Sequence, residues 1–179
     1  MSALQTQQSA AQGPIYLLLA EDHARLDRLL NDAAADPGSI EPALYAAFRR
    51  RLLKHIGMEE KILLPAAQRL NGNEPLPIAA RLRLDHGAIA ALLVPSPTHR
   101  IVAALKTILA AHNALEEGAG GLYETCDRLA RDHSNALVEQ LRHAPEVPAA
   151  PHNDGPKVMP AARRALVRAG YEGLLLAEF

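Results

Sequence analysis

The sequence contains no tryptophan, a single cysteine (Cys126) and only 3% aromatic residues. One cysteine excludes a disulfide framework within the chain and a CxxC redox or zinc motif. Lys plus Arg (19) nearly equal Asp plus Glu (20), and no basic run occurs, so we expect no nucleic-acid partner. No apolar stretch is long enough to span a membrane, and residues 1–13 lack the pattern of a signal peptide. We therefore expect a cytoplasmic protein with no membrane partner.

What the chain has in quantity is small and aliphatic residues. Hydrophobic residues make up 49% of the 179 positions, and most are alanine and leucine. This composition favours helices that pack closely on one another, and the length is sufficient for one domain with a buried core. The expected fold class is all-α.

Apolar residues recur at steps of three and four in four successive stretches, which predicts four amphipathic helices. We expect the first to begin at Pro14 and end before Asp36, and the second to run from about residue 41 to Leu70 with a kink at Pro65. The third should run from Pro77 to Pro95, and the fourth should follow an N-cap at Thr98. After the glycines at 118–121, a helical pattern resumes at Leu122 and continues to about Arg142.

These stretches define the expected domain organisation. Residues 1–13 should form a disordered lead-in, and residues 14–143 one helical domain. Residues 144–179 read as a Pro/Ala-rich linker and a short C-terminal helix over 160–169. The apolar end of this segment, 174–176, should either pack back on the domain or contact a second copy, which would give a homodimer.

The most informative stretch is residues 55–59, in which a histidine and a glutamate are four residues apart. His55 and Glu59 should lie on one helix face, with Cβ atoms roughly 5–6 Å apart, and that face is the apolar stripe. Burying a carboxylate beside an imidazole is unfavourable unless something compensates it. His112 and Glu116 repeat the same spacing in the fourth helix. Two such pairs are difficult to explain without metal.

An internal repeat extends this pattern. Asp22-His23 aligns with Asp85-His86, and each is followed by a His-x3-Glu-Glu motif; beyond these motifs, Leu64 aligns with Tyr123. Each half then forms a helical hairpin, and together they predict an up-down-up-down four-helix bundle with a C-terminal extension. Six candidate metal ligands should point into the bundle: His23, His55, Glu59, His86, His112 and Glu116.

This donor set predicts two ions. It offers too many ligands for one zinc ion, which prefers four. If each glutamate bridges, each ion receives two nitrogens and two oxygens, and positions remain for a bridging oxygen and an outside ligand. Nitrogen and oxygen donors without thiolate fit iron or manganese best, so we expect two iron ions in a diiron-oxo centre, with manganese or zinc as alternatives.

The arrangement over about residues 14–130 resembles the hemerythrin-like family of His-His-Glu cation-binding bundles. Oxygen-carrying hemerythrins have a fifth histidine one turn after the first histidine of their third helix, where this chain has Ala90. The four-His, two-Glu set is more similar to the repair-of-iron-centres proteins. The resemblance implies a diiron protein that binds or senses a small diatomic ligand, oxygen or nitric oxide. The alternative is a redox or iron-homeostasis enzyme that reduces nitric oxide or peroxide or repairs iron-sulfur clusters, so enzyme activity stays undecided.

The neighbours of these ligands allow two interpretations. Glu60 and Glu117 should face solvent or bind the ligand imidazoles from behind. Asp22 and Asp85 have the same options, with the surface favoured. Tyr16, Tyr45 and Tyr123 are expected to be packing residues, and His99, His143 and His152 to be solvated. His133, which follows Asp132, should lie at the surface or bind behind a ligand, with a competing role as a ligand as the lesser alternative.

Overall fold

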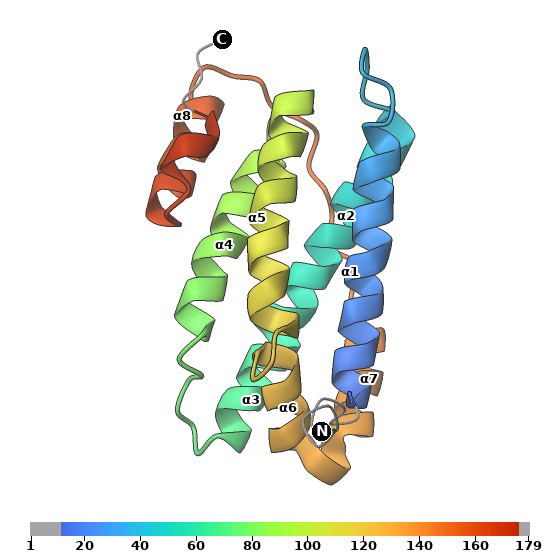
Figure 1. Cartoon of the computed structure of the whole chain (residues 1–179), viewed down its shortest axis with the longest axis vertical. Helices are drawn as coiled ribbons and strands as arrows, with labels where there is room; N and C mark the ends of the chain where they lie inside the picture. Colours follow the sequence, from blue (N-terminus) through green and yellow to red (C-terminus); the bar gives the residue numbers. More distant parts are fainter. Residues whose placement is uncertain (1–11, 176–179) are drawn as a thin grey trace, which may run out of the picture.

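Figure 1 shows a computed structural model of the chain, in which the structure describes residues 12–175. These residues form helices and connecting loops, with no strand in the described part of the chain. The all-α fold class is therefore confirmed. The expected lead-in lies almost wholly in residues 1–11, outside the described residues. No helix within 12–175 has both the length and the apolar character needed to cross a bilayer.

Four long helices lie side by side along the long axis of the molecule (Figure 1): α1 (Pro14–Ala33), α2 (Pro42–Met58), α4 (Ala79–Leu92) and α5 (His99–Glu117). Helix α1 packs against α2 and α5, and α4 packs against α5. Thr98 caps α5 as expected, because its side chain accepts a hydrogen bond from the Ile101 N–H at 3.2 Å. Helices α1, α4 and α5 lie within the predicted stretches, although α4 begins two residues after Pro77, whereas α2 ends at Met58 and not at Leu70.

Helix α2 continues through a π-helical turn, η1 (Glu59–Leu63), into α3 (Leu64–Leu70). The Leu64 N–H bonds to the Glu59 carbonyl, five residues back, which is the π pattern. Pro65 follows directly and has no N–H to continue the ladder. The disturbance expected at Pro65 is therefore a π-helical turn that includes Glu59 itself.

The segment after α5 differs from the prediction of one helix to Arg142. It forms α6 (Leu122–Ala130), a 3-10 turn η2 (Arg131–His133) and α7 (Ser134–Arg142). The break lies at Arg131, whose positive φ of 46° interrupts the helical backbone between α6 and α7. Helix α6 supports the start of α1, because the Asp127 carboxylate accepts the N–H groups of Ile15 (3.1 Å) and Tyr16 (2.9 Å). Helix α7 also packs against α1.

The C-terminal segment contains the expected short helix, α8 (Val158–Arg168), followed by a 3-10 turn, η3 (Glu172–Leu175). Helix α8 packs along α4 (Figure 1) and buries Ala162 and Leu166 in the core. Leu174 also packs against this core, while residues 176–179 lie outside the described part. A homodimer formed through this segment stays a prediction.

The buried side chains form two hydrophobic clusters, one toward each end of the long helices. One cluster contains Leu26, Phe48, Leu52, Ile89 and Ile108, and the other contains Leu19, Leu63, Leu82, Leu122 and Leu141. The candidate ligands fall between these apolar residues in the sequence of each helix. A polar layer thus separates two apolar layers, and this layer is the site described next.

Candidate metal centre

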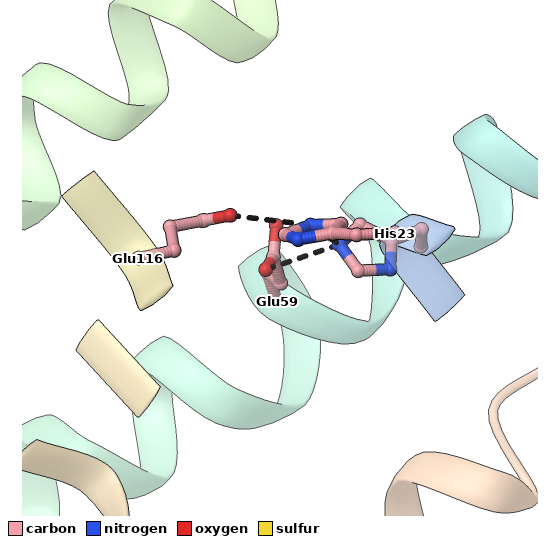
Figure 2. A group of neighbouring side chains, drawn as sticks. His23, Glu59 and Glu116 are labelled. Atoms are coloured by element: carbon pink, nitrogen blue, oxygen red, sulfur yellow. Dashed lines mark hydrogen bonds and ion pairs between the residues drawn. The ribbon is translucent and has the colours of Figure 1, made fainter. Parts of the chain in front are cut away.

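The structure brings all six predicted side chains together in the polar layer. Glu59 and Glu116 are fully buried, and the four histidines are at most 5% exposed. Figure 2 shows His23, Glu59 and Glu116 pointing toward one another from three different helices. Two groups of four side chains each have ligand atoms within 4.8 Å of one another: His23, His55, Glu59 and Glu116, and Glu59, His86, His112 and Glu116. Both glutamates belong to both groups.

The four histidines form two pairs. The Nε2 atoms of His23 and His55 are 2.9 Å apart, and those of His86 and His112 are 3.2 Å apart. Both pairs therefore direct the same ring nitrogen to the interior of the site. The pairs come from α1 with α2 and from α4 with α5, as the internal repeat predicts.

Each glutamate reaches both histidine pairs, one oxygen to each. Glu59 places Oε1 3.3 Å from His55 Nε2 and Oε2 3.1 Å from His86 Nε2. Glu116 places Oε2 3.4 Å from His23 Nε2 and Oε1 3.2 Å from His112 Nε2. The site is therefore two N2O2 donor groups that share two carboxylates.

A second set of carboxylates holds the outer ring nitrogens. Glu117 Oε1 lies 2.5 Å from His23 Nδ1, and Glu60 Oε1 lies 2.7 Å from His86 Nδ1. Of the two alternatives for these glutamates, the structure shows the contact with the imidazoles. When the Nδ1 protons of His23 and His86 are donated to these carboxylates, the Nε2 lone pairs of the neutral rings face the interior.

Asp22 and Asp85 complete this second set, so the preference for a surface position was wrong. Asp22 is 6% exposed and Asp85 is fully buried. Asp22 Oδ2 lies 2.9 Å from His55 Nδ1, and Asp85 Oδ2 lies 3.5 Å from His112 Nδ1. Each aspartate is adjacent in sequence to one histidine and contacts the histidine of the next helix.

Three arginines offset charge on the outer carboxylates. Arg51 pairs with Asp22, Arg81 Nη2 lies 2.8 Å from Asp85 Oδ1, and Arg83 Nε lies 3.2 Å from Glu60 Oε2. For the inner glutamates, the ion-pair partners found among residues 12–175 are histidines only. Without a metal ion, protonated histidines must supply the compensating positive charge.

The pKa values show how strongly the site attracts cations. Burial opposes a charge on His55, but Glu59 and Asp22 outweigh it and raise the pKa of His55 to about 10. Burial likewise opposes a charge on His112, but Asp85 and Glu116 raise its pKa to about 10. Burial and the nearby charge of Glu59 raise the pKa of Glu116. Metal ions would take the place of these protons.

Tyr123 also belongs to the site, although the sequence indicated only packing. Its hydroxyl donates to Glu59 Oε1 at 2.6 Å and lies 3.1 Å from both Glu116 Oε2 and His23 Nε2. The residue is fully buried, and burial together with the two glutamates raises the pKa of its phenol well above the usual value. The phenol therefore stays protonated, and its hydroxyl lies between the two glutamates and can donate a hydrogen bond to either of them.

The glycine-rich loop after Glu117 explains how Tyr123 reaches the centre. At Gly121, a Cβ atom would lie 2.7 Å from the Glu116 carbonyl oxygen, so only glycine fits this close approach. Helix α6 then begins against the end of α5. The internal repeat contained a signal for this residue, because it aligns Tyr123 with Leu64 and so places a polar group where the first half has an apolar one.

The remaining histidines lie outside the centre. His99, His133, His143 and His152 are exposed, as expected. Cys126 is a buried residue of α6, and burial raises the pKa of its thiol to about 12, with Asp127 next in effect. Neither observation adds a ligand to the six.

The residues present could hold metal. Glu59 Oε2 and Glu116 Oε1 are buried and have no hydrogen-bond donor among the described residues, and the facing Nε2 atoms offer lone pairs to the same space. Nitrogen and oxygen donors of this kind can hold a metal ion. In comparisons with protein-family models, with curated proteins and with solved structures, nothing matches this chain. The chain is thus a helical protein with buried His/Glu groups that could bind metal.

Proposed function

We propose that this chain is a hemerythrin-like up-down-up-down four-helix bundle that holds two iron ions and binds or senses a small diatomic ligand, oxygen or nitric oxide. The proposal rests on one observation: Glu59 and Glu116 each direct one carboxylate oxygen to each histidine pair. This pattern is that expected of two carboxylates that bridge two ions. His23 and His55 would hold one iron, and His86 and His112 the other.

The absence of sulfur ligands supports iron or manganese over softer metals. Two adjacent iron ions, when bound, supply a reversible electron change and a free coordination position. The protein contributes the orientation of the imidazoles, through the four outer carboxylates, and the exclusion of bulk water. It also contributes the phenol of Tyr123, which can donate a hydrogen bond at Glu59.

An uncharged ligand suits the surroundings of the centre. The residues one turn away are apolar and buried: Leu19, Leu26, Leu52, Leu82, Ile89 and Ile108. A cavity of about 120 Å³ between α1 and α5 is lined by His23, Leu26, Leu109 and Asn113 among others. It supports an approach to His23 for a molecule of two atoms.

The test begins with metal analysis of protein prepared with iron and with manganese, followed by anaerobic reduction and exposure to oxygen or nitric oxide. We expect about two irons per chain and a reversible ligand-to-metal absorption band. His55→Ala and His112→Ala should reduce the iron content, and His133→Ala, which changes an exposed histidine, should not. Protein that contains iron but never shows the band would refute ligand binding while leaving the metal site intact.

A second candidate is a diiron redox or iron-homeostasis enzyme. It is favoured by Tyr123, since a phenol that stays protonated beside the centre can donate a hydrogen bond where negative charge develops during reduction of nitric oxide or peroxide. Steady turnover with an electron donor, lost in Glu59→Ala, would support the enzyme. Binding of a stoichiometric amount of ligand without turnover would support the sensor or carrier.

A further inference from the structure

A large cavity lies beside α1 and α2, and none of the six candidate metal ligands lines it. It measures about 470 Å³, within the range of about 300–1,000 Å³ typical of small-molecule sites. Residues of α1, of α2 and of the end of α7 with the following segment line it. Three parts of the chain that are distant in sequence thus form one concave surface.

Positive charge dominates this cavity. Its cationic lining residues are Arg25, Arg50, Arg51, Lys54 and Arg142, against the three carboxylates of Glu21, Asp22 and Glu146. The cations come from all three parts of the wall. The chain as a whole has a formal net charge of −1, so this excess is local to the cavity.

The carboxylates of the lining do not satisfy all of these cations. Arg51 pairs with Asp22, and Lys54 Nζ lies 2.7 Å from Glu146 Oε1. Arg50 has no hydrogen-bond or ion-pair partner among residues 12–175. Arg142 has its nearest carboxylate, Glu139, at 3.8 Å, and 59% of its side chain is exposed. Two guanidinium groups can therefore turn their donors to a ligand.

Of the other three cations, Arg25 and Lys54 have ion-pair partners that a ligand can replace. Arg25 pairs with Glu21 on the same helix, and both side chains are about half exposed. Glu146 is 72% exposed. Ion pairs between such exposed groups are weak, so the carboxylates of a ligand can compete with Glu21 and Glu146 for these cations.

We propose that this cavity binds a small anion with more than one negative charge, a dicarboxylate or tricarboxylate. Cations converge from α1, α2 and α7, so a single charged group would engage only one side of the cavity. The apolar lining residues Leu18, Leu29 and Met58 suit the carbon skeleton between the anionic groups. The proposal does not rest on the iron function, because none of the six candidate ligands lines the cavity; Asp22, the partner of His55, lies in its wall.

The test is calorimetric titration of the metal-loaded protein with succinate, a dianion that binds iron weakly, at constant ionic strength. We expect one site per chain and, for the monoanion acetate, affinity weaker by about tenfold or more. Arg50→Ala should weaken succinate binding by about tenfold or more. Arg28→Ala is the matched control, since Arg28 is also an exposed arginine of these helices but does not line the cavity.

Arg50 is exposed, so the variant should keep the wild-type melting temperature and iron content, and both serve as checks of folding. Absence of succinate binding at millimolar concentration would overturn the proposal. Equal losses in Arg50→Ala and Arg28→Ala would also overturn it, because they would show a general effect of charge. Equal affinities for succinate and acetate would refute the requirement for more than one negative charge.

Discussion

The sharpest prediction compares two adjacent glutamates of the π-helical turn, Glu59 and Glu60. Glu59 contacts both histidine pairs through different oxygens, His55 at 3.3 Å and His86 at 3.1 Å. Glu60 contacts the outer nitrogen of His86 at 2.7 Å. Glu59→Gln and Glu60→Gln preserve volume, and each removes one negative charge at neighbouring positions of the chain. Any difference between the two variants therefore reports their positions relative to the two histidine pairs.

The expected magnitudes differ widely. A carboxylate that bridges two ions serves both, so Glu59→Gln should lose both irons under conditions that load the wild-type protein. Glu60→Gln keeps an oxygen that can accept a hydrogen bond from His86 Nδ1–H. Mutation of a residue that hydrogen-bonds a metal-binding histidine changes metal affinity by about 10–100-fold. We expect the lower end of that range and a full iron content at excess metal.

Thermal stability gives an independent readout. Metal at a hundred times its dissociation constant stabilises the folded state by about 2.7 kcal/mol, which raises the melting temperature of a chain of this size by about 5–10 °C. The assay is a thermal melt with and without iron(II) under anaerobic conditions, together with elemental analysis of the same samples. The wild type and Glu60→Gln should show the rise, and Glu59→Gln should not.

One result would refute the reasoning. If Glu59→Gln binds about two irons and melts with the full metal-dependent rise, Glu59 does not bridge the two histidine pairs. Loss of both irons in Glu60→Gln as well would show that the inner and outer carboxylates are not distinct in function.

Three further predictions concern pH, the phenol and the C-terminal helix. The pKa values of His55 and His112 are raised to about 10 in the metal-free fold, so the folded state binds more protons than the unfolded chain. The free energy of unfolding should therefore fall as pH rises from about 6.5 to about 10, and metal affinity should rise over the same range. Denaturant titrations and metal competition at several pH values check these two expectations. Tyr123→Phe should keep about two irons but shift the ligand-to-metal absorption band, because it removes the hydrogen bond to Glu59, and an unchanged spectrum would exclude a role at the centre. Leu166→Ala should lower the free energy of unfolding by about 2–5 kcal/mol, because Leu166 of α8 is only 2% exposed, and the iron content should not change. A loss of less than about 0.5 kcal/mol in a denaturant titration would show that α8 does not contribute to the core.

The helices and the six inward side chains followed from the sequence alone. An α-helix places residues at steps of three and four on one face whatever it packs against, so His55 and Glu59 had to share a face. Their position in an apolar stripe then required burial. The internal repeat predicted in the same way that His23 and His86 face inward, and this prediction does not depend on the distances between helices.

The outer carboxylates were decided by the tertiary structure. Asp22 is adjacent to His23 in sequence, but it contacts His55 on the neighbouring helix. A residue one position from a ligand is rotated about 100° around its helix, at the edge of the buried face. Whether that edge meets solvent or the next imidazole depends on the spacing and rotation of the packed helices, which periodicity does not specify.

The break at Arg131 and the position of Tyr123 were likewise decided by the packing of helices. The turn at Arg131 adopts a positive φ where the sequence carries a continuous helical pattern, and α7 then packs against α1. Tyr123 enters the centre because the loop at Gly118–Gly121 positions α6 against the end of α5. The sequence by itself determined which side chains face inward, since local helix geometry fixes this; the tertiary structure decided which groups hold and complete the site, since contacts between helices exist only after packing.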